Sequence, residues 1–385
     1  MKALLLEDAR KMAVRRVPDP AVPPHEVLIG VRAVGVCGTD FHLFQGDANY
    51  HRDARGRLIP LTEQPQILGH EFSGEVLELG RDVKDLRPGD RVLCDQGRHC
   101  RSEGRRPLCP YCASGESHQC DYYQEHGITG LAGALADYIA IPAVSCLRVP
   151  EEMTWEEAAL VEPLACVLHS CDRAERASAR FRFDASGGGS HGDRSIRNVL
   201  ICGAGPAGLL FLQYLRNVQG FEGLILVADL RAGNLKLAQA MGGTPVNVAE
   251  RGLVEAVREH TAGQRIHYLI EASGSAAIFR EIPALLRRQG TVLIYGIGHK
   301  GHDTSVLGPM LFLEPTLVAA VGASGGSDAD GRPTTYRRAL EMVSSGKVKA
   351  LPFVTHRYHS LENVHLAFEK DFQRQDYIKG VLDLS

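Results

Sequence analysis

The chain has 385 residues, of which 44% are hydrophobic and 23% charged, a globular composition that excludes extended disorder and coiled-coil or collagen-like architecture. At roughly 100–200 residues per domain, this length predicts two or three domains. The 43 Lys and Arg against 46 Asp and Glu leave a net charge of −3, so nucleic acid and membrane surfaces are excluded as main partners. The N-terminus has no basic segment followed by a long apolar run, so we expect no secretory signal and a cytoplasmic location.

The first part of the chain, to about residue 165, predicts an antiparallel β domain with a barrel-like core. It is rich in Gly and Pro, and turn signals such as Pro88-Gly89-Asp90 separate short β-like runs. These runs are Val27–Val34, Ser73–Leu79, Arg91–Cys94 and Ala136–Ile141.

From Asn198 the pattern changes to alternating strands and helices, which predicts a parallel doubly wound sheet. The strand-like runs are Val199–Cys202, Leu224–Ala228, Tyr268–Ile270, Thr291–Tyr295 and Thr316–Val321. The helix-like runs are Asn234–Met241, Leu253–Glu259 and, in the tail, Tyr336–Ser344 and Leu361–Lys370. The segment 176–197, with the Gly-rich stretch 185–193, has the composition of a flexible loop and is expected to be exposed and poorly ordered.

The hexapeptide Gly203-Ala204-Gly205-Pro206-Ala207-Gly208 matches the pattern GxGxxG, which predicts a dinucleotide site only in the right context. Here an apolar strand precedes it, the helix-like run Pro206–Gln219 follows it, and Asp229 ends the next strand. Glycines allow backbone to approach a pyrophosphate, and Asp229 would bind ribose hydroxyls and repel a 2′-phosphate. The sequence therefore favours NAD over NADP, although Arg231 could partly offset this preference.

Ten cysteines occur in the chain, and five of them lie between Cys94 and Cys120. In a reducing cytosol, clustered cysteines more often hold a metal than form disulfides. Cys109-x2-Cys112-x7-Cys120 supplies three thiols, and a structural zinc needs four, so Cys100 and Cys94 are the candidates for the fourth ligand. Free thiols clustered on a loop would be open to oxidation, which favours zinc.

Three other candidate ligands are spread along the chain: Cys37 in GVCGTDFH, His70 in GHE and Glu162 in VEPL. Taken singly, each is more often a structural residue than a ligand. Together, a thiolate, an imidazole and a carboxylate would fill three positions of a catalytic zinc and leave the fourth for water or substrate.

In combination these motifs resemble the zinc-dependent medium-chain dehydrogenases/reductases of the alcohol dehydrogenase superfamily, in the branch of polyol, sugar and L-threonine dehydrogenases. The resemblance covers nearly the whole chain and rests on GVCGTDFH, ILGHEFSG, the turn PGDRV, the cysteine lobe, VEPLA and GAGPAG, in the family's order. It implies an α/β protein with a GroES-like β-barrel catalytic domain, residues 1–165 completed by 325–385. Residues 166–324 would form a Rossmann NAD-binding domain with a doubly wound parallel sheet.

The resemblance also implies roles for the residues around the catalytic zinc. Cys37, His70 and Glu162 would surround the metal, and Glu71 would be either a direct ligand or a partner that exchanges with water. Thr39 and His42 match the family's proton relay, and Asp40 would orient the residues that hold zinc.

In the cysteine lobe the chain departs from the family's usual C-x2-C-x2-C-x7-C, because Arg106 stands at one expected cysteine position. Cys100 lies where the first lobe cysteine usually falls, so the resemblance assigns a structural zinc to Cys100, Cys109, Cys112 and Cys120. Cys94 is then expected to be a core thiol.

The function implied is oxidation of a secondary alcohol by hydride transfer to NAD, with one catalytic and one structural zinc. The polar stretch Asp47–Gln64, longer than usual for the family, suggests a small hydrophilic substrate such as a polyol, sugar, cyclitol or amino sugar, although a solvated loop explains it equally well. L-threonine 3-dehydrogenase is the alternative enzyme, and a non-catalytic zinc- and NAD-binding regulatory protein is the alternative of another class. The family usually forms homodimers or homotetramers, so Thr316–Val321 is the candidate interface strand.

Overall fold

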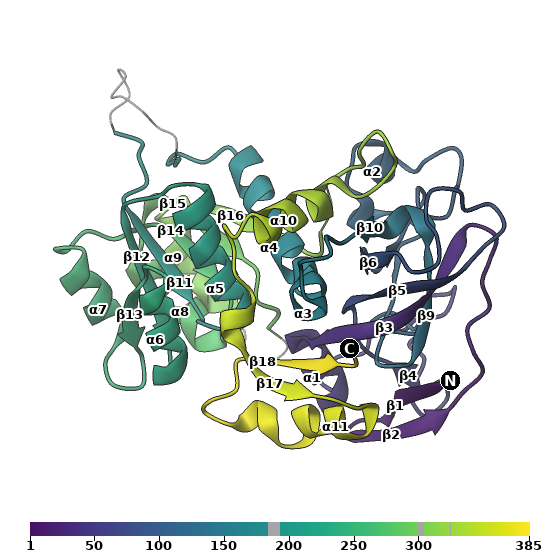
Figure 1. Ribbon diagram of the computed structural model, residues 1–385. Helices are drawn as coiled ribbons and strands as arrows, with labels where there is room; N and C mark the ends of the chain where they lie inside the picture. Colours follow the sequence, from purple (N-terminus) through teal and green to yellow (C-terminus); the bar gives the residue numbers. More distant parts are fainter. Residues whose placement is uncertain (184–192, 299–303, 324) are drawn as a thin grey trace. The chain divides into compact units, whose positions relative to one another are not determined.

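The computed structural model describes residues 1–183, 193–298, 304–323 and 325–385 (Figure 1). The chain divides into two compact units. The first comprises Met1–Cys166, Gly322–Gly346 and Ala350–Ser385, and the second comprises Val167–Val321 with Lys347–Lys349. The Gly-rich stretch 185–193, expected to be exposed, lies outside the described residues apart from Asp193.

The first unit is built on antiparallel β-structure. Its largest sheet has the strand order β10-β6-β5-β3-β18-β17, and β9 also pairs with β3; only β17 and β18 run parallel. These strands are β3 (Glu26–Val36), β5 (Glu71–Leu79), β6 (Arg91–Cys94), β9 (Tyr138–Pro142), β10 (Cys146–Arg148), β17 (Val354–Tyr358) and β18 (Lys379–Asp383). Two smaller sheets contain β1 (Lys2–Asp8), β2 (Lys11–Arg16) and β4 (Gln66–Ile67), and β7 (Gly97–Arg98) with β8 (Gln124–Glu125).

Alternating inward side chains of these strands form one hydrophobic core, which confirms the expected β domain. The helices of this unit are α1 (Gly38–Gln45), α2 (Pro110–Ala113), α3 (Trp155–Ala159), α10 (Thr334–Ser344) and α11 (Leu361–Glu369). The long strand β3 pairs with both β5 and β18, so residues from distant parts of the sequence meet at its C-terminal end.

The second unit is a six-stranded parallel sheet with the order β13-β12-β11-β14-β15-β16. Its strands are β11 (Asn198–Cys202), β12 (Leu224–Asp229), β13 (Thr244–Asn247), β14 (Ile266–Glu271), β15 (Leu286–Ile294) and β16 (Thr316–Ala319). Because right-handed crossovers run in opposite directions from β11, the connecting helices cover both faces, and the strand order reverses between β11 and β14 (Figure 1). The expected doubly wound sheet is thereby confirmed.

The helices of the second unit follow the strands in alternation. They are α5 (Pro206–Gln213), α6 (Ala232–Ala240), α7 (Leu253–His260), α8 (Ala276–Leu285) and α9 (Leu307–Leu311), and a π-helical turn, η3 (Tyr214–Val218), continues α5. The chain passes from the first unit to the second within α4 (Val161–Arg176). Among the described residues, no helix combines the length and apolarity needed to cross a membrane.

Candidate functional site

Cys37 and His70 are held by one buried carboxylate. Cys37 lies between β3 and α1, where it is the N-cap of the helix. The third residue of that helix, Asp40, reaches back so that its Oδ2 accepts the Cys37 backbone N–H at 2.9 Å. Its other oxygen, Oδ1, lies 3.4 Å from His70 Nδ1. Asp40 therefore orients both residues and leaves the second ring nitrogen of His70, Nε2, for a metal.

Glu71 joins this site because β5 pairs with β3 in a register that sets it opposite Gly35. A Cβ atom at position 35 would lie only 2.1 Å from Glu71 Oε2, so only glycine leaves room for this carboxylate. Lys379, from β18 on the other side of β3, donates to Glu71 Oε1 at 2.7 Å and lies 2.6 Å from Oε2. Both residues are buried, so the ion pair compensates two charges that the core could not otherwise hold.

The ligand atoms of Cys37, His70 and Glu71 all lie within 4.8 Å of one another. Burial disfavours the imidazolium form of His70, but the charges of Asp40 and Cys37 prevail and raise its pKa well above the usual value. The negative charges that favour the imidazolium form of His70 would also favour a bound cation. Thiolate, imidazole and carboxylate donors at this spacing fit zinc with an open coordination position.

Glu162 lies outside this ligand group, in the first turn of α4. Its Oε1 accepts hydrogen bonds from Gln96 Nε2 at 2.8 Å and from the Cys166 thiol at 3.3 Å. Burial raises the pKa of Glu162 to about 7, with His70 acting in the opposite direction. Gln96 also donates to Glu125 at 2.9 Å and accepts from the Tyr336 hydroxyl, so it connects two carboxylates beside the candidate metal site.

The two residues expected to form a proton relay both lie on α1. Thr39 Oγ1 lies 3.9 Å from the Cys37 sulfur, in the first turn of the helix. His42 occupies the last turn, one helical turn further along the chain, and is partly exposed. The structure therefore places Thr39 near the sulfur of a candidate zinc ligand, and both Thr39 and His42 are half-buried.

The four lobe cysteines form a second candidate metal site. The sulfur atoms of Cys100, Cys109, Cys112 and Cys120 lie within 4.8 Å of one another, and all four residues are buried. Cys109 caps α2, and the backbone N–H of Cys112 lowers the pKa of the Cys109 thiol to about 6. Four converging thiols, one readily ionised, fit a closed tetrahedral zinc site.

Cys94, the other candidate for the fourth position, lies in β6 and is buried in the core of the first unit. Its sulfur faces Cys146 on β10 at 3.6 Å, and burial raises the pKa of the Cys94 thiol well above its usual value. The structure thus brings Cys100, and not Cys94, to the other three lobe cysteines.

The glycine-rich loop follows β11 in the second unit. Gly203 has a φ of 103°, in the region that favours glycine, and a Cβ at Gly208 would lie 1.8 Å from the Gly203 carbonyl oxygen. A Cβ at Gly205 would have no protein atom within 4 Å, so the loop is open at that residue. Pro206 and Ala207 begin α5, whose N-terminal N–H groups suit a pyrophosphate.

Asp229 lies at the C-terminal end of β12, beside the glycine-rich loop. Its Oδ2 accepts the Ala204 backbone N–H at 2.7 Å and its Oδ1 accepts that of Arg231 at 2.8 Å. The carboxylate is partly exposed, so its remaining lone pairs can receive the hydroxyls of a ribose.

Sequence reasoning missed Lys379, Gln96, Glu125 and Tyr336. A signal existed for one of them, because Lys379 directly precedes the apolar run Gly380–Leu382 of the final strand, and a lysine buried there requires a partner. Gln96 and Tyr336 are neutral residues whose polar atoms converge only through the fold, so the sequence alone carries no such signal.

Comparison with known proteins gives concordant results. The model of the alcohol dehydrogenase GroES-like domain matches residues 23–151, and the model of zinc-binding dehydrogenases matches residues 206–345. The chain is 29% identical to a sorbitol dehydrogenase of Bacillus subtilis over 97% of this chain and 94% of the relative. It is 29% identical to an L-threonine 3-dehydrogenase of Photorhabdus laumondii over 92% of this chain and 91% of the relative.

A zinc-binding dehydrogenase of Sinorhizobium meliloti, solved with NADP, has a similar structure. It is 26% identical, the TM-score is 0.78, and the match covers 99% of this chain and 98% of the other.

Proposed function

Since the chain belongs to the zinc-binding alcohol dehydrogenase superfamily of medium-chain dehydrogenases/reductases, we propose that it oxidises a secondary alcohol of a polar substrate with NAD. The observation that carries this proposal is the convergence of the half-buried Cys37 with the buried His70 and Glu71. Asp40 and Lys379 are the charged partners of this group. A structural zinc site is closed by four protein ligands. Three convergent donors that leave a coordination position open are therefore typical of a catalytic site.

In the proposed reaction, zinc would supply a Lewis acid that makes the substrate hydroxyl easier to deprotonate, and NAD would supply the hydride acceptor. Asp40 fixes the direction of Cys37 and His70, and Lys379 fixes Glu71, so the donors need no rearrangement. The Thr39 hydroxyl relays the proton: it accepts the substrate's hydroxyl proton as it releases its own, and His42 receives that released proton and passes it to solvent.

For the cofactor we propose NAD. Asp229 would accept hydrogen bonds from both ribose hydroxyls of the adenosine, and its charge would repel a 2′-phosphate. The Sinorhizobium meliloti relative was solved with NADP, so membership of the family does not by itself decide the cofactor. Arg231, two residues after Asp229, carries a positive charge that would favour the phosphate.

For the substrate we propose a polyol or sugar. The polar segment 47–64 is ordered by its own contacts, because Asp53 accepts the backbone N–H groups of Arg55 and Arg57 at 2.9 Å. His51 anchors this segment. Its buried imidazole packs so closely against Gly130 that a Cβ atom at that residue would overlap the ring. An ordered polar segment supports a hydrophilic substrate, as does the sorbitol dehydrogenase relative.

A substrate panel tests this function. NAD reduction at 340 nm would be followed with sorbitol, other polyols, sugars, cyclitols, amino sugars, L-threonine and a series of aliphatic alcohols. We expect kcat/KM to be highest for a polyol or sugar. A preference for L-threonine would establish the alternative dehydrogenase, and a preference for long aliphatic alcohols would contradict a polar substrate. NAD binding without turnover of any alcohol would favour the non-catalytic alternative.

We also propose that the chain forms a homodimer or homotetramer in the cytoplasm. β16 is an edge strand of the parallel sheet, and its Leu317 is exposed, as are Leu311 and Phe312 just before the strand. An unpaired apolar edge of this kind is commonly covered by a second chain. A reducing compartment keeps thiols available for zinc.

A further inference from the structure

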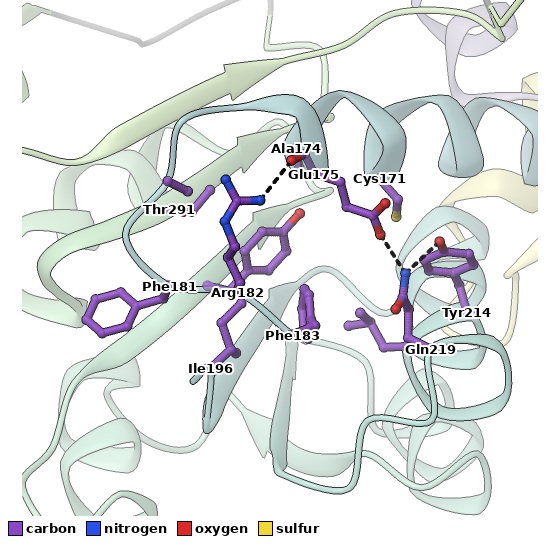
Figure 2. A pocket seen from close by; sticks show the side chains of 13 residues that line it. Cys171, Ala174, Glu175, Phe181, Arg182, Phe183, Ile196, Tyr214, Gln219 and Thr291 are labelled. Atoms are coloured by element: carbon purple, nitrogen blue, oxygen red, sulfur yellow. Dashed lines mark hydrogen bonds between the residues drawn. The ribbon is translucent and has the colours of Figure 1, made fainter. Parts of the chain in front are cut away.

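A cavity lies within the parallel-sheet unit, and neither the proposed reaction nor its cofactor uses it. Its volume is about 410 Å³, within the range of small-molecule sites (Figure 2). Ile196, two residues before β11, lines it, whereas the glycine-rich loop begins after that strand ends. In a parallel sheet the N-terminal ends of all strands lie on one side and the C-terminal ends on the other. The cavity is therefore distinct from the candidate cofactor site, which lies at the C-terminal ends.

One wall of the cavity is aromatic. Phe181 and Phe183 come from the segment before the Gly-rich stretch, for which the proposed function gives no role. The Phe183 ring packs edge-on against Tyr268 of β14, with 5.3 Å between ring centroids and an angle of 67°. Phe221 holds Phe183 from another side, also edge-on at 5.3 Å. These rings are fixed in place and offer faces and edges for a further aromatic ring.

The lining also includes polar side chains, with one charge of each sign. Glu175, near the end of α4, accepts a hydrogen bond from Gln219 Nε2 at 2.6 Å, and Gln219 also donates to the Tyr214 hydroxyl at 2.9 Å (Figure 2). Arg182 donates to the backbone carbonyls of Glu175 and Ala177 at 3.2 and 3.3 Å, with further N–H groups left on its guanidinium. Glu175 and Arg182 are the only acidic and basic side chains among the described lining residues, so their charges cancel.

Thr291 supplies an independent observation. It lies on β15 beside Tyr268, its residue is 1% exposed, and its Oγ1 makes no hydrogen bond to any residue that the structure describes. A buried hydroxyl without a partner is costly, and such groups usually bind a water or a ligand. Because Thr291 lines the cavity, that partner would occupy the cavity.

We propose that this cavity binds a small aromatic compound that is neutral overall and carries a hydrogen-bond donor and an acceptor, an aromatic amino acid being the simplest example. Its ring packs on Phe183 and Tyr268. Its donor faces Glu175, its acceptor faces Arg182, and the Thr291 hydroxyl gains a polar partner. This inference goes beyond the proposed dehydrogenase function and does not depend on it.

Isothermal titration of the full-length protein with L-tryptophan, in saturating NAD, tests the proposal. We expect binding that NAD does not displace, and at least tenfold weaker binding of tryptamine and of indole-3-propionate, each of which lacks one of the two charged groups. Cyclohexylalanine, which keeps both charges without an aromatic ring, should also bind more weakly. No binding of L-tryptophan or L-phenylalanine at millimolar concentration, or displacement by NAD, would overturn the proposal.

Two variants localise the site. Thr291→Val removes an unpaired hydroxyl at constant shape, so the fold should persist while affinity for L-tryptophan falls about tenfold. Thr244→Val, the same change on β13 in the same sheet, is the matched control and should bind as the unmodified chain does. Ala179→Trp should fill the cavity and abolish binding. Unchanged affinity in both Thr291→Val and Ala179→Trp would place the bound compound elsewhere and overturn the assignment.

Discussion

Glu71 and Lys379 are 1% and 3% exposed, and each is the compensating charge of the other. Burial disfavours the charged form of Lys379, but the Glu71 carboxylate prevails and raises its pKa. A buried charge that loses its partner is far more costly than the intact pair is stabilising. A substitution that removes one member of this ion pair should therefore affect both the stability of the protein and the candidate zinc site.

Lys379→Met should lower the free energy of unfolding by roughly 3 kcal/mol, because Glu71 would be left as an uncompensated buried carboxylate. Urea denaturation of the zinc-free protein measures this change. Lys379→Arg keeps the charge and is the control, with an expected loss well under that of the methionine variant. Equal stability of Lys379→Met and the unmodified chain would show that Glu71 is not charged in the folded protein.

His42→Ala should lower kcat on the order of 10²-fold near neutral pH, because proton transfer to solvent loses its carrier. The loss should shrink as pH rises, since hydroxide replaces the imidazole as the final acceptor. His365→Ala, on the surface of α11, is a control for the loss of an exposed histidine. An unchanged turnover and pH profile in His42→Ala would exclude it from the relay.

Much of the candidate site follows from the residues alone, because the ligand types stand in motifs with fixed local geometry. Cys37, Asp40 and Thr39 lie within one turn, so the sequence already places them together. Whether Glu71 or Glu162 approaches the metal could not be deduced, since it depends on the register of β3 with β5 and on Lys379 from the end of the chain.

At the scale of secondary structure, two glycines of the glycine-rich loop are required for different physical reasons. Position 208 is crowded by the Gly203 carbonyl, whereas position 205 is open and has an ordinary extended backbone, with φ −74° and ψ −175°. Glycine at position 208 is required by packing within the protein, and glycine at position 205 by the approach of a ligand. Substitution at each position should therefore affect stability and cofactor binding separately.

Gly208→Ala should cost about 2 kcal/mol of stability, because its methyl group overlaps the loop backbone and the helix must shift. Gly205→Ala should fold as stably as the unmodified chain yet weaken NAD binding at least tenfold, since its methyl group would meet the pyrophosphate. Thermal unfolding and fluorescence titration with NADH measure the two effects. Normal NADH affinity in Gly205→Ala would exclude this loop as the pyrophosphate site.

The expected strands of both units are present, with ends shifted by a few residues, because apolar runs between turn signals define them well. The run Thr291–Tyr295 proved too short, since β15 begins at Leu286 with a polar stretch that reads as a loop. α4 has no helical signal of this kind in the sequence. Residues 161–171 are buried on every side and therefore lack helical periodicity, and Pro163 stands at its start.

At the scale of the whole molecule, five of the twelve large hydrophobic residues that are exposed in the described part of the chain lie near one edge of the parallel sheet. Leu307, Leu311, Phe312, Leu317 and Val321 lie on α9, on β16 and directly beside these elements, and Phe312 is 83% exposed. Scattered exposed hydrophobic residues need no explanation, but several within fifteen residues of an edge strand indicate an interface.

Phe312→Asp should convert the oligomer into a monomer, because a charge placed in an apolar interface is not compensated there. Size-exclusion chromatography with light scattering gives the mass directly. Leu366→Asp, at an exposed apolar residue of α11 in the other unit, is the matched control and should leave the mass unchanged. A monomeric unmodified chain would rule out the proposed assembly.

Zinc per chain and NAD reduction, measured on the same samples, decide whether the protein is a zinc-dependent dehydrogenase with separate catalytic and structural metals. We expect one zinc for each of the two ligand groups in the unmodified chain. Cys37→Ala should lose one zinc and all NAD reduction, and Cys100→Ala should lose the other zinc and stability. Unchanged zinc content and activity in Cys37→Ala would exclude Cys37 as a ligand of a catalytic zinc.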